Sequence, residues 1–510
     1  MKRIKIGKLL PAVIAMAVTT SAITGCNSRN GDIMTPPVVP PDIIFYALTD
    51  NNQLIKYNAA STAAPDPAIS LTGIPTGEKI ISIDFRPATG QLYGLGSNSR
   101  LYLLNTRNGI ATALGTTAFT PAVNSSIANI DFNPTVDRVR LVTDKGQNLR
   151  LHPETGAVAA TDGTINGGSM PAVTSIAYTN SVAGAAATEL FDIDATSRKL
   201  YKQNPPNDGG LQEVGSIAVD FTGKPGFDIN DDNSVALATF QVGGINKLYR
   251  INTSNAAAEF LSNLAGNITD IAIPTPPVAY AISESGMFQI FNPRKSNSVI
   301  NKTIAGTGMG EEFMGIDFRP VNGQLYGITV TSTGNARLYT FNLSTGAAAP
   351  VGSGFMLTAG TTGIGFDFNP TVDRIRLVSN TGQNLRLNPN DGTIAATDAN
   401  LNPGSPAVSG AAYSSNFPGA ASTFLYVMDM GKLYRQEPPN NGTLVELGSL
   451  GITADAQNGF DMGGNSNMAY ALLTSGGVTK LYNINISSVS PGESIDFPNK
   501  VKGFSLGLGF

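Results

Sequence analysis

The chain has 510 residues, of which 14% are charged and 41% hydrophobic, and its formal net charge is −4 at pH 7. This length is sufficient for two or more domains with full hydrophobic cores. The slightly acidic balance gives no basic surface of the kind that nucleic acid requires, so nucleic-acid binding is excluded as the main role. The 56 Gly and 31 Pro residues, with frequent Val, Ile, Thr and Tyr, favour an all-β protein.

The N-terminus has the pattern of a bacterial lipoprotein signal, which predicts a signal peptide over residues 1–25. Four basic residues among the first eight precede the apolar run Leu9–Val18, and Ile23–Cys26 then resembles a lipobox. Cys26 is the only cysteine in the chain, so we expect it to carry lipid and to anchor the protein to a membrane. An ordinary secretory signal is the alternative. Asn27 in place of Asp after the cysteine favours the outer membrane, with the periplasmic or surface face left open.

A Pro-rich tether is predicted over residues 26–42. Pro-rich spacers are extended and semi-rigid, so this segment would hold the folded body away from the bilayer. A single cysteine allows no internal disulfide and no cysteine-based metal site. After the signal peptide, no stretch approaches the roughly 20 continuous apolar residues of a spanning helix.

The rest of the chain is a duplication. Asp131–Val142 (DFNPTVDRVRLV) recurs as Asp367–Val378 (DFNPTVDRIRLV), identical at eleven of twelve positions, and GQNLRL at Gly146–Leu151 recurs unchanged at Gly382–Leu387. A second Pro-rich joint, Pro274–Pro277, lies where the second copy begins. The two copies are therefore predicted at 43–273 and 278–510.

Inside each copy a shorter period repeats, with short alternating strands in groups of four joined by tight turns. The groups open with ISIDFRP at Ile81, ANIDFNP at Ala128, TSIAYTN at Thr174 and GFDIN at Gly226. Four such strands are typical of one blade of a β-propeller.

Strand counting predicts how the rings close. Each copy begins with only three strands, continues with four full groups and ends with an orphan strand, ITDIAI at Ile268 or KGFSLGLGF at Lys502 and beyond. An orphan last strand that completes the first blade closes a ring and removes exposed sheet edges. The sequence thus favours two tandem five-bladed β-propellers; one ten-bladed propeller is the alternative.

The duplicated motif contains the candidate ligand-binding residues. Residues two apart on a strand share a face, so Arg138 and Arg140 lie together, and the neighbouring strand brings Arg150 to them. One interpretation is an ion-pair brace between packed sheets. The other is an arginine patch for an anionic or glycan ligand. The candidates for ligand binding are Arg138, Arg140, Arg150, Arg374, Arg376 and Arg386, and those for structural ion pairs are Asp131, Asp137, Asp367 and Asp373.

Carboxylates outside this motif give weaker signals. The strand openers Asp84, Asp131, Asp317 and Asp367 are interpreted as strand-end caps, although an acid–base pair in a propeller channel is an alternative. Asp228, Asn230 and Asp232 are weak candidates for Ca²⁺, because the stretch is rich in oxygen ligands but lacks the Gly and Glu of an EF-hand loop. No cofactor is expected otherwise, and no catalytic residue is assigned.

With the lipobox, the duplication and the DFNPxxDRxR…GQNLRL stretches in view, the chain resembles an uncharacterised bacterial family of secreted proteins and lipoproteins, classed as a domain of unknown function. The resemblance covers both copies and implies a propeller-type surface domain. The predicted role is a lipid-anchored binding module of the cell envelope, with an envelope protein or glycan as partner. Two alternatives stay open: a glycan lyase or hydrolase that uses channel carboxylates, and a structural envelope component. The oligomeric state is left open.

Overall fold

The computed structural model describes residues 38–167, 171–455 and 458–510. The predicted signal peptide, Cys26 and most of the predicted tether lie outside these residues. The described part contains forty β-strands and three one-turn 3-10 helices, η1 (Ala59–Ser61), η2 (Pro206–Asp208) and η3 (Pro439–Asn441). Within these described residues, no helix is long and apolar enough to cross a membrane.

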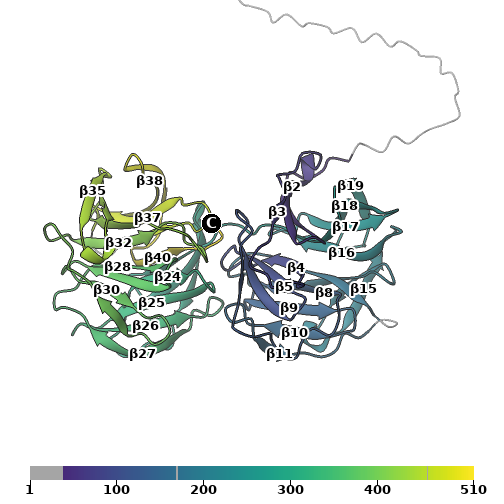
Figure 1. Cartoon of the computed structure of the whole chain (residues 1–510), viewed down its shortest axis with the longest axis horizontal. Coiled ribbons are helices and arrows are strands. Elements are labelled where there is room, and N and C mark those ends of the chain that lie inside the picture. Colours follow the sequence, from purple (N-terminus) through teal and green to yellow (C-terminus); the bar gives the residue numbers. More distant parts are fainter. Residues whose placement is uncertain (1–37, 168–170, 456–457) are drawn as a thin grey trace, which may run out of the picture. The chain divides into compact units, whose positions relative to one another are not determined.

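The strands form ten antiparallel sheets of four strands each, coloured in chain order in Figure 1. Five of these sheets, which we call ring 1, are built from the first copy. From the innermost strand outward they are β4 (Ile80–Phe85), β5 (Leu92–Gly96), β6 (Arg100–Leu104), β7 (Ala111–Ala113); β8 (Ala128–Asn133), β9 (Arg138–Thr143), β10 (Asn148–Leu151), β11 (Val158–Thr161); β12 (Val173–Tyr178), β13 (Leu190–Asp194), β14 (Lys199–Gln203), β15 (Leu211–Ser216); β16 (Thr222–Ile229), β17 (Ala236–Val242), β18 (Ile245–Ile251), β19 (Ala258–Asn263); and β20 (Ile268–Ala272), β1 (Ile44–Thr49), β2 (Gln53–Asn58), β3 (Ile69–Ser70).

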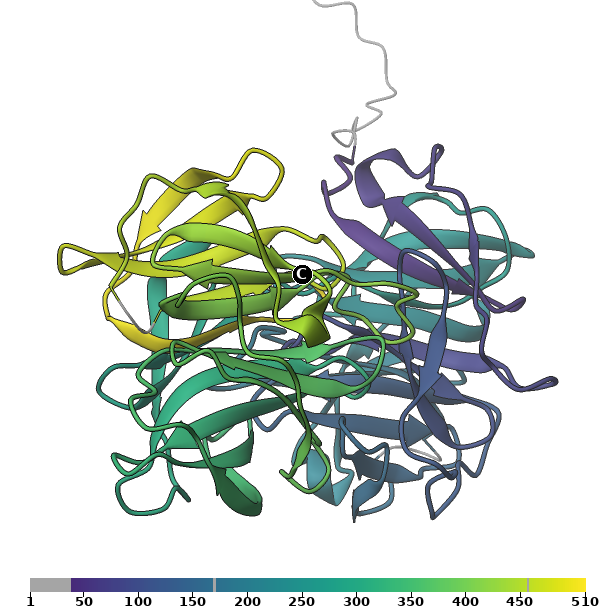
Figure 2. The same cartoon turned by 60° about the vertical axis from the view of Figure 1, so that its left-hand side comes forward.

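The other five sheets, ring 2, are built from the second copy, and Figure 2 shows them from another side. In the same order they are β24 (Glu312–Arg319), β25 (Gln324–Val330), β26 (Asn335–Phe341), β27 (Ala348–Met356); β28 (Ile364–Asn369), β29 (Arg374–Ser379), β30 (Asn384–Leu387), β31 (Ile394–Thr397); β32 (Val408–Tyr413), β33 (Leu425–Asp429), β34 (Lys432–Gln436), β35 (Leu444–Ser449); β36 (Gly459–Met462), β37 (Ala469–Ser475), β38 (Val478–Asn485), β39 (Ser490–Asp496); and β40 (Val501–Leu506), β21 (Ala279–Ser283), β22 (Met287–Asn292), β23 (Lys295–Thr303).

Each ring closes on itself through its last strand. β20 pairs antiparallel with β1, and β40 pairs antiparallel with β21, so the orphan strand of each copy completes that copy's own first blade. The inner strands then contact one another in a cycle, β4–β8–β12–β16–β20 in ring 1 and β24–β28–β32–β36–β40 in ring 2. The prediction of two five-bladed propellers is confirmed, and the ten-bladed alternative is wrong because neither orphan strand pairs into the other copy.

The hydrophobic core lies between neighbouring blades, because the strands alternate and each sheet is apolar on both faces. Between the first two blades of ring 1, for example, Tyr93 packs edge-on against Phe132 with ring centroids 4.8 Å apart. The equivalent pair in ring 2, Tyr326 and Phe368, has the same edge-on geometry at 5.2 Å. The inner strands are therefore held in fixed positions around each channel.

Candidate functional site

The arginines of the duplicated motif are engaged by the protein's own side chains. The guanidinium of Arg140 is buried and donates to Asn148 Oδ1 at 2.7 Å and to Asn207 Oδ1 at 2.7 Å, and it also pairs with Asp162. Arg150 lies opposite Arg140 on the next strand and holds the same carboxylate with two hydrogen bonds of 2.8 Å. Asp162 thus binds both arginines.

Ring 2 repeats this cluster. Arg376 is buried against Asn384, Asn440 and Asp398, and Arg386 holds Asp398 with two hydrogen bonds of 2.9 Å. In both rings, two arginines therefore share one aspartate and have the contacts of an internal brace. The arginine pairs are Arg140 with Arg150 and Arg376 with Arg386. Sequence reasoning did not name Asp162 or Asp398, although the repeated tetrapeptide AATD that contains them was a usable signal.

Arg138 and Arg374 are not part of these clusters. Each is half-buried at the start of its strand and donates to the backbone carbonyl of the preceding aspartate, Asp137 or Asp373, at 2.8 and 2.9 Å. The carboxylates of these two aspartates bind a different arginine, Arg86 in ring 1 and Arg319 in ring 2, each at 2.8 Å from Nε.

Asp131 and Asp367 point to the next blade and belong to a group of channel acids. The inner strand of each blade has one edge without a paired strand, so its backbone N–H groups need other acceptors. Asp131 accepts the N–H of Tyr178 at 3.0 Å, and Asp84 accepts that of Phe132 at 2.7 Å. In ring 2 the acceptors are Asp367 and Asp317. These aspartates link successive inner strands around the channel.

A third aspartate completes a carboxylate triad in each ring. Asp228 joins Asp84 and Asp131 in ring 1, and Asp461 joins Asp317 and Asp367 in ring 2. In each triad, one carboxylate oxygen from each residue lies within 4.8 Å of the other two. All six side chains are buried.

Burial controls the protonation of these triads. Burial raises the pKa of Asp228 and that of Asp461 to about 7. The pKa values of the other four acids are raised well above the usual range, first by burial and then by repulsion from neighbouring triad carboxylates, for Asp84, Asp131, Asp317 and Asp367. Three carboxylates at this spacing could share protons or hold a hard cation such as Ca²⁺.

The predicted Ca²⁺ stretch divides between two places. The carboxylate of Asp228 turns inward and accepts the N–H of Ile229 and that of Ile273. Asn230 and Asp232 instead form a local turn, in which Asn230 Nδ2 donates to Asp232 Oδ1 at 2.8 Å. The structure therefore brings Asp228 to the triad and leaves the buried Asn230 and the exposed Asp232 in a separate turn.

The two rings differ at one position of the inner strands. It lies two residues before the triad aspartate, or before the equivalent residue in the blades without one, and we call it the rim position. In ring 2 every rim residue is glycine. In ring 1 four of the five are polar. The ring 1 residues are Ser82, Asn129, Ser175, Gly226 and Asp270, and the ring 2 residues are Gly315, Gly365, Gly410, Gly459 and Gly503.

The rim side chains of ring 1 form a buried polar network. Asp270 Oδ2 accepts Ser82 Oγ at 2.6 Å and Asn129 Nδ2 at 3.0 Å. The ammonium of Lys224 donates to Ile81 O at 2.6 Å and lies 3.3 Å from the same Asp270 oxygen. Burial lowers the pKa of Lys224 and raises that of Asp270, and the attraction between the two groups opposes both shifts. Sequence reasoning missed Lys224 and Asp270, and no repeated motif marks them.

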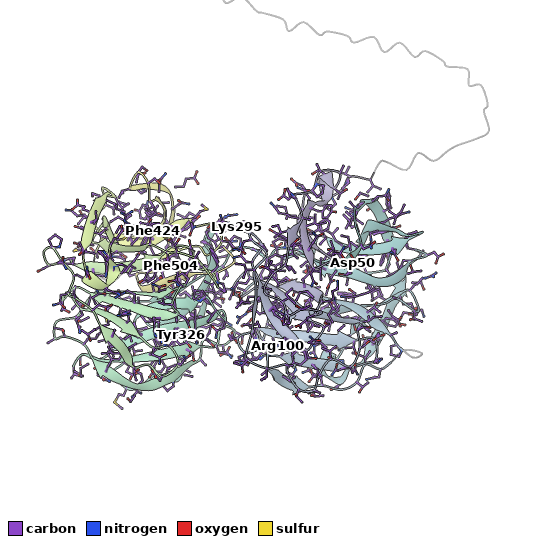
Figure 3. All side chains as sticks on the ribbon, in the orientation of Figure 1. Asp50, Arg100, Lys295, Tyr326, Phe424 and Phe504 are labelled. Atoms are coloured by element: carbon purple, nitrogen blue, oxygen red, sulfur yellow. The ribbon has the colours of Figure 1, made fainter. Side chains whose placement is uncertain are left out.

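A cavity of about 540 Å³ opens over this network at one end of the ring 1 channel. Its walls are the first residues of β4, β16 and β20 and the segment before β8. Asp50, labelled in Figure 3, lies on its edge after β1. The lining residues are Asp50, Lys79, Ile80, Ile81, Ser126, Ile127, Thr222, Gly223, Lys224, Gln241, Asn246, Asn267, Ile268 and Thr269. A cavity of this size at a channel mouth, lined by four isoleucines and by several convergent polar groups, has the character of a small-ligand site.

The chain belongs to the family described as Domain of unknown function (DUF4394), which matches residues 16–272 and 287–504. The resemblance predicted from the repeated motifs is thereby confirmed. A search of curated proteins returns no match. Among solved structures, one that aligns is described as PorZ, an essential bacterial surface component of the type-IX secretion system of Porphyromonas gingivalis. It is 14% identical, the alignment covers 91% of this chain and 67% of PorZ, and the TM-score of 0.25 is too low to carry a functional argument.

Proposed function

We propose that the protein is a binding module of the cell envelope, tethered through lipid on Cys26, and that ring 1 holds its ligand at the mouth of the channel. The cavity over Lys224 carries this proposal. It combines a hollow of about 540 Å³, four isoleucines and the largely buried ammonium of Lys224 in one place. The ligand class is a segment of an envelope protein or a glycan.

The motif arginines are not the proposed site, because their guanidinium groups already have protein partners. Arg140 and Arg376 are each 2% exposed or less, and each donates to an asparagine and pairs with an aspartate. We assign no catalysis to the carboxylate triads either, because their oxygens accept backbone N–H groups that link the blades.

Ligand binding by the purified full chain tests the proposal. A panel of short peptides and oligosaccharides is titrated by calorimetry against the wild type and against Ser126→Trp, which fills the cavity from an exposed wall position. We expect Ser126→Trp to abolish binding and the equivalent ring 2 change, Thr362→Trp, to leave it intact. Binding that survives Ser126→Trp, or that is lost in Thr362→Trp, would contradict a site in ring 1.

The membrane tether is tested separately by metabolic labelling with palmitate. We expect label in the wild type and none in Cys26→Ser, which would then leave the membrane fraction. Label retained in Cys26→Ser would show that another residue carries the lipid.

A further inference from the structure

Lys224 is the buried cation of the cavity, and the protein uses only part of its hydrogen-bonding capacity. Its side chain is 12% exposed and is part of the cavity wall. An ammonium has three N–H donors. One of them goes to Ile81 O at 2.6 Å, and the contact with Asp270 is long, at 3.3 Å. At least one donor therefore remains for a group inside the cavity.

Asp270 does not depend on Lys224 for its hydrogen bonds. Its Oδ2 accepts from Ser82 Oγ, from the N–H of Ile83 and from Asn129, and its Oδ1 accepts the N–H of Ile271. Asp270 is 1% exposed and lies below the residues that line the cavity. A ligand that approaches Lys224 would therefore add a partner to the ammonium without leaving Asp270 unsatisfied.

The residues that line the cavity carry one more positive than negative group, and Asp270 beneath them pairs with Lys224. The lining residues carry two ammonium groups, Lys79 and Lys224, and one carboxylate, Asp50. Asp50 already accepts Asn267 Nδ2 at 3.0 Å through Oδ2, and Lys79 donates to the backbone carbonyl of Asp50 at 2.7 Å. Lys79 is exposed at the edge, so Lys224 is the cation that a buried ligand group would meet.

The apolar part of the wall is aliphatic. Four isoleucines line the cavity, and none of the described residues that line it is aromatic. Sugar-binding sites commonly offer an aromatic face for the ring, whereas branched aliphatic walls favour burial of an aliphatic group. The isoleucines are Ile80, Ile81, Ile127 and Ile268.

Building on the proposed function, we infer that the ring 1 cavity takes a carboxylate carried on an aliphatic body, with Lys224 as the carboxylate-binding residue and the isoleucines around the aliphatic group. A charge-assisted hydrogen bond from the ammonium would fix the carboxylate end. The same chemistry is offered by the C-terminal residue of a polypeptide and by a free aliphatic acid.

Calorimetric titration of the full chain with three probes tests this inference: N-acetyl-isoleucine, its C-terminal amide, and isovalerate. We expect the two acids to bind and the amide to bind at least about tenfold more weakly, the effect of one lost charge-assisted contact. Tighter binding of N-acetyl-isoleucine than of isovalerate would identify a polypeptide C-terminus as the source, and equal binding would identify a free acid.

Variants sharpen the test. Lys224→Met should weaken the binding of the two acids to the level of the amide. Asp270→Asn should retain acid binding. The control is Lys502→Met, which replaces a lysine on the closing strand of ring 2 and should leave binding unchanged. Equal binding of acid and amide to the wild type would overturn the inference even if Lys224→Met fails to fold. Glucuronate that binds while both aliphatic acids fail would overturn it as well. If no probe binds while other ligands are lost in Ser126→Trp, the proposed site stands and the carboxylate inference fails.

Discussion

Ring 1 and ring 2 have the same blades, the same arginine brace and the same carboxylate triad, but their channels differ at the rim position. Ring 2 has glycine in all five inner strands, and at four of these glycines an added Cβ would lie less than 3.0 Å from an atom of the next blade. A Cβ on Gly459 would lie 2.1 Å from Phe504 Cβ, and one on Gly365 would lie 2.5 Å from Ala411 Cβ. Phe504 is among the residues labelled in Figure 3.

Ring 1 uses side chains where ring 2 uses close backbone packing. Ser82 Oγ accepts the N–H of Ile130, and Asn129 Oδ1 accepts that of Ile176, both at 3.0 Å. These polar groups link the strands while leaving Lys224 and its cavity at the mouth. The shared motifs therefore maintain the propeller, whereas the positions that differ between the copies carry the candidate binding site.

The largest effect should come from the brace that both rings share. We expect Arg140→Ala and Arg376→Ala each to lower the free energy of unfolding by about 3–5 kcal/mol, because each leaves a nearly buried aspartate without its buried partner. Urea unfolding of the two variants measures this loss. A loss in one ring only would break the equivalence of the two braces.

The triads predict a pH dependence that is also common to both rings. Asp228 and Asp461 have folded-state pKa values of about 7, against an ordinary value of 3.8. Between these values the folded state keeps a proton that the unfolded chain has released, so stability is greatest at the acidic end and falls as the pH rises through 7. Above this pH window, each group would lower the free energy of unfolding by on the order of 4 kcal/mol, since one pKa unit corresponds to about 1.4 kcal/mol.

Urea unfolding at about pH 5 and about pH 8 measures this trend, and the matched pair Asp228→Asn and Asp461→Asn should each flatten it. Stability that rises with pH would show that the triads are ionised in the folded protein. Repeating the measurement with Ca²⁺ distinguishes proton sharing from cation binding, because only a bound cation would restore stability at the higher pH.

The glycine rim of ring 2 gives an intermediate effect. Gly459→Ala should cost about 1–3 kcal/mol or more, because the added methyl group overlaps Phe504 in a packed core. Gly492→Ala is the control in the same blade, since its Cβ would meet no atom closer than 3.3 Å, the carbonyl oxygen of Asn483. Thermal unfolding compares the two; equal melting temperatures would mean that ring 2 can open at its rim.

The sequence was sufficient for the fold because the fold depends on local and repeated features. Alternating strands, turn residues and the orphan strand at Ile268 predicted ring closure, and β20 does pair with β1. Two-residue spacing and antiparallel pairing also placed Arg140 opposite Arg150. These inferences needed only strand periodicity and the order of the strands.

The partners of these groups could not be predicted in the same way. Asp162, which binds both arginines, lies beyond the motif after the fourth strand of the blade, and Lys224 meets Asp270 across two different blades. The Lys224–Asp270 contact depends on how far apart the inner strands lie around the channel, a distance that no local pattern encodes. The rim glycines could be seen in the sequence, but the reason for glycine at these positions is the close approach of the inner strands, which the sequence does not show.

The smallest effect should come from the arginines at the strand starts. Arg138→Ala and Arg374→Ala should each change the free energy of unfolding by no more than about 0.5 kcal/mol, because each side chain donates to a backbone carbonyl at a half-exposed turn. The measurement is thermal unfolding of these variants next to Arg140→Ala and Arg376→Ala, which compares two arginines of the same motif in each ring. A large loss at Arg138 alone would show that ring 1 uses this arginine in a way that ring 2 does not, and the difference between the copies would then extend beyond the channel rim.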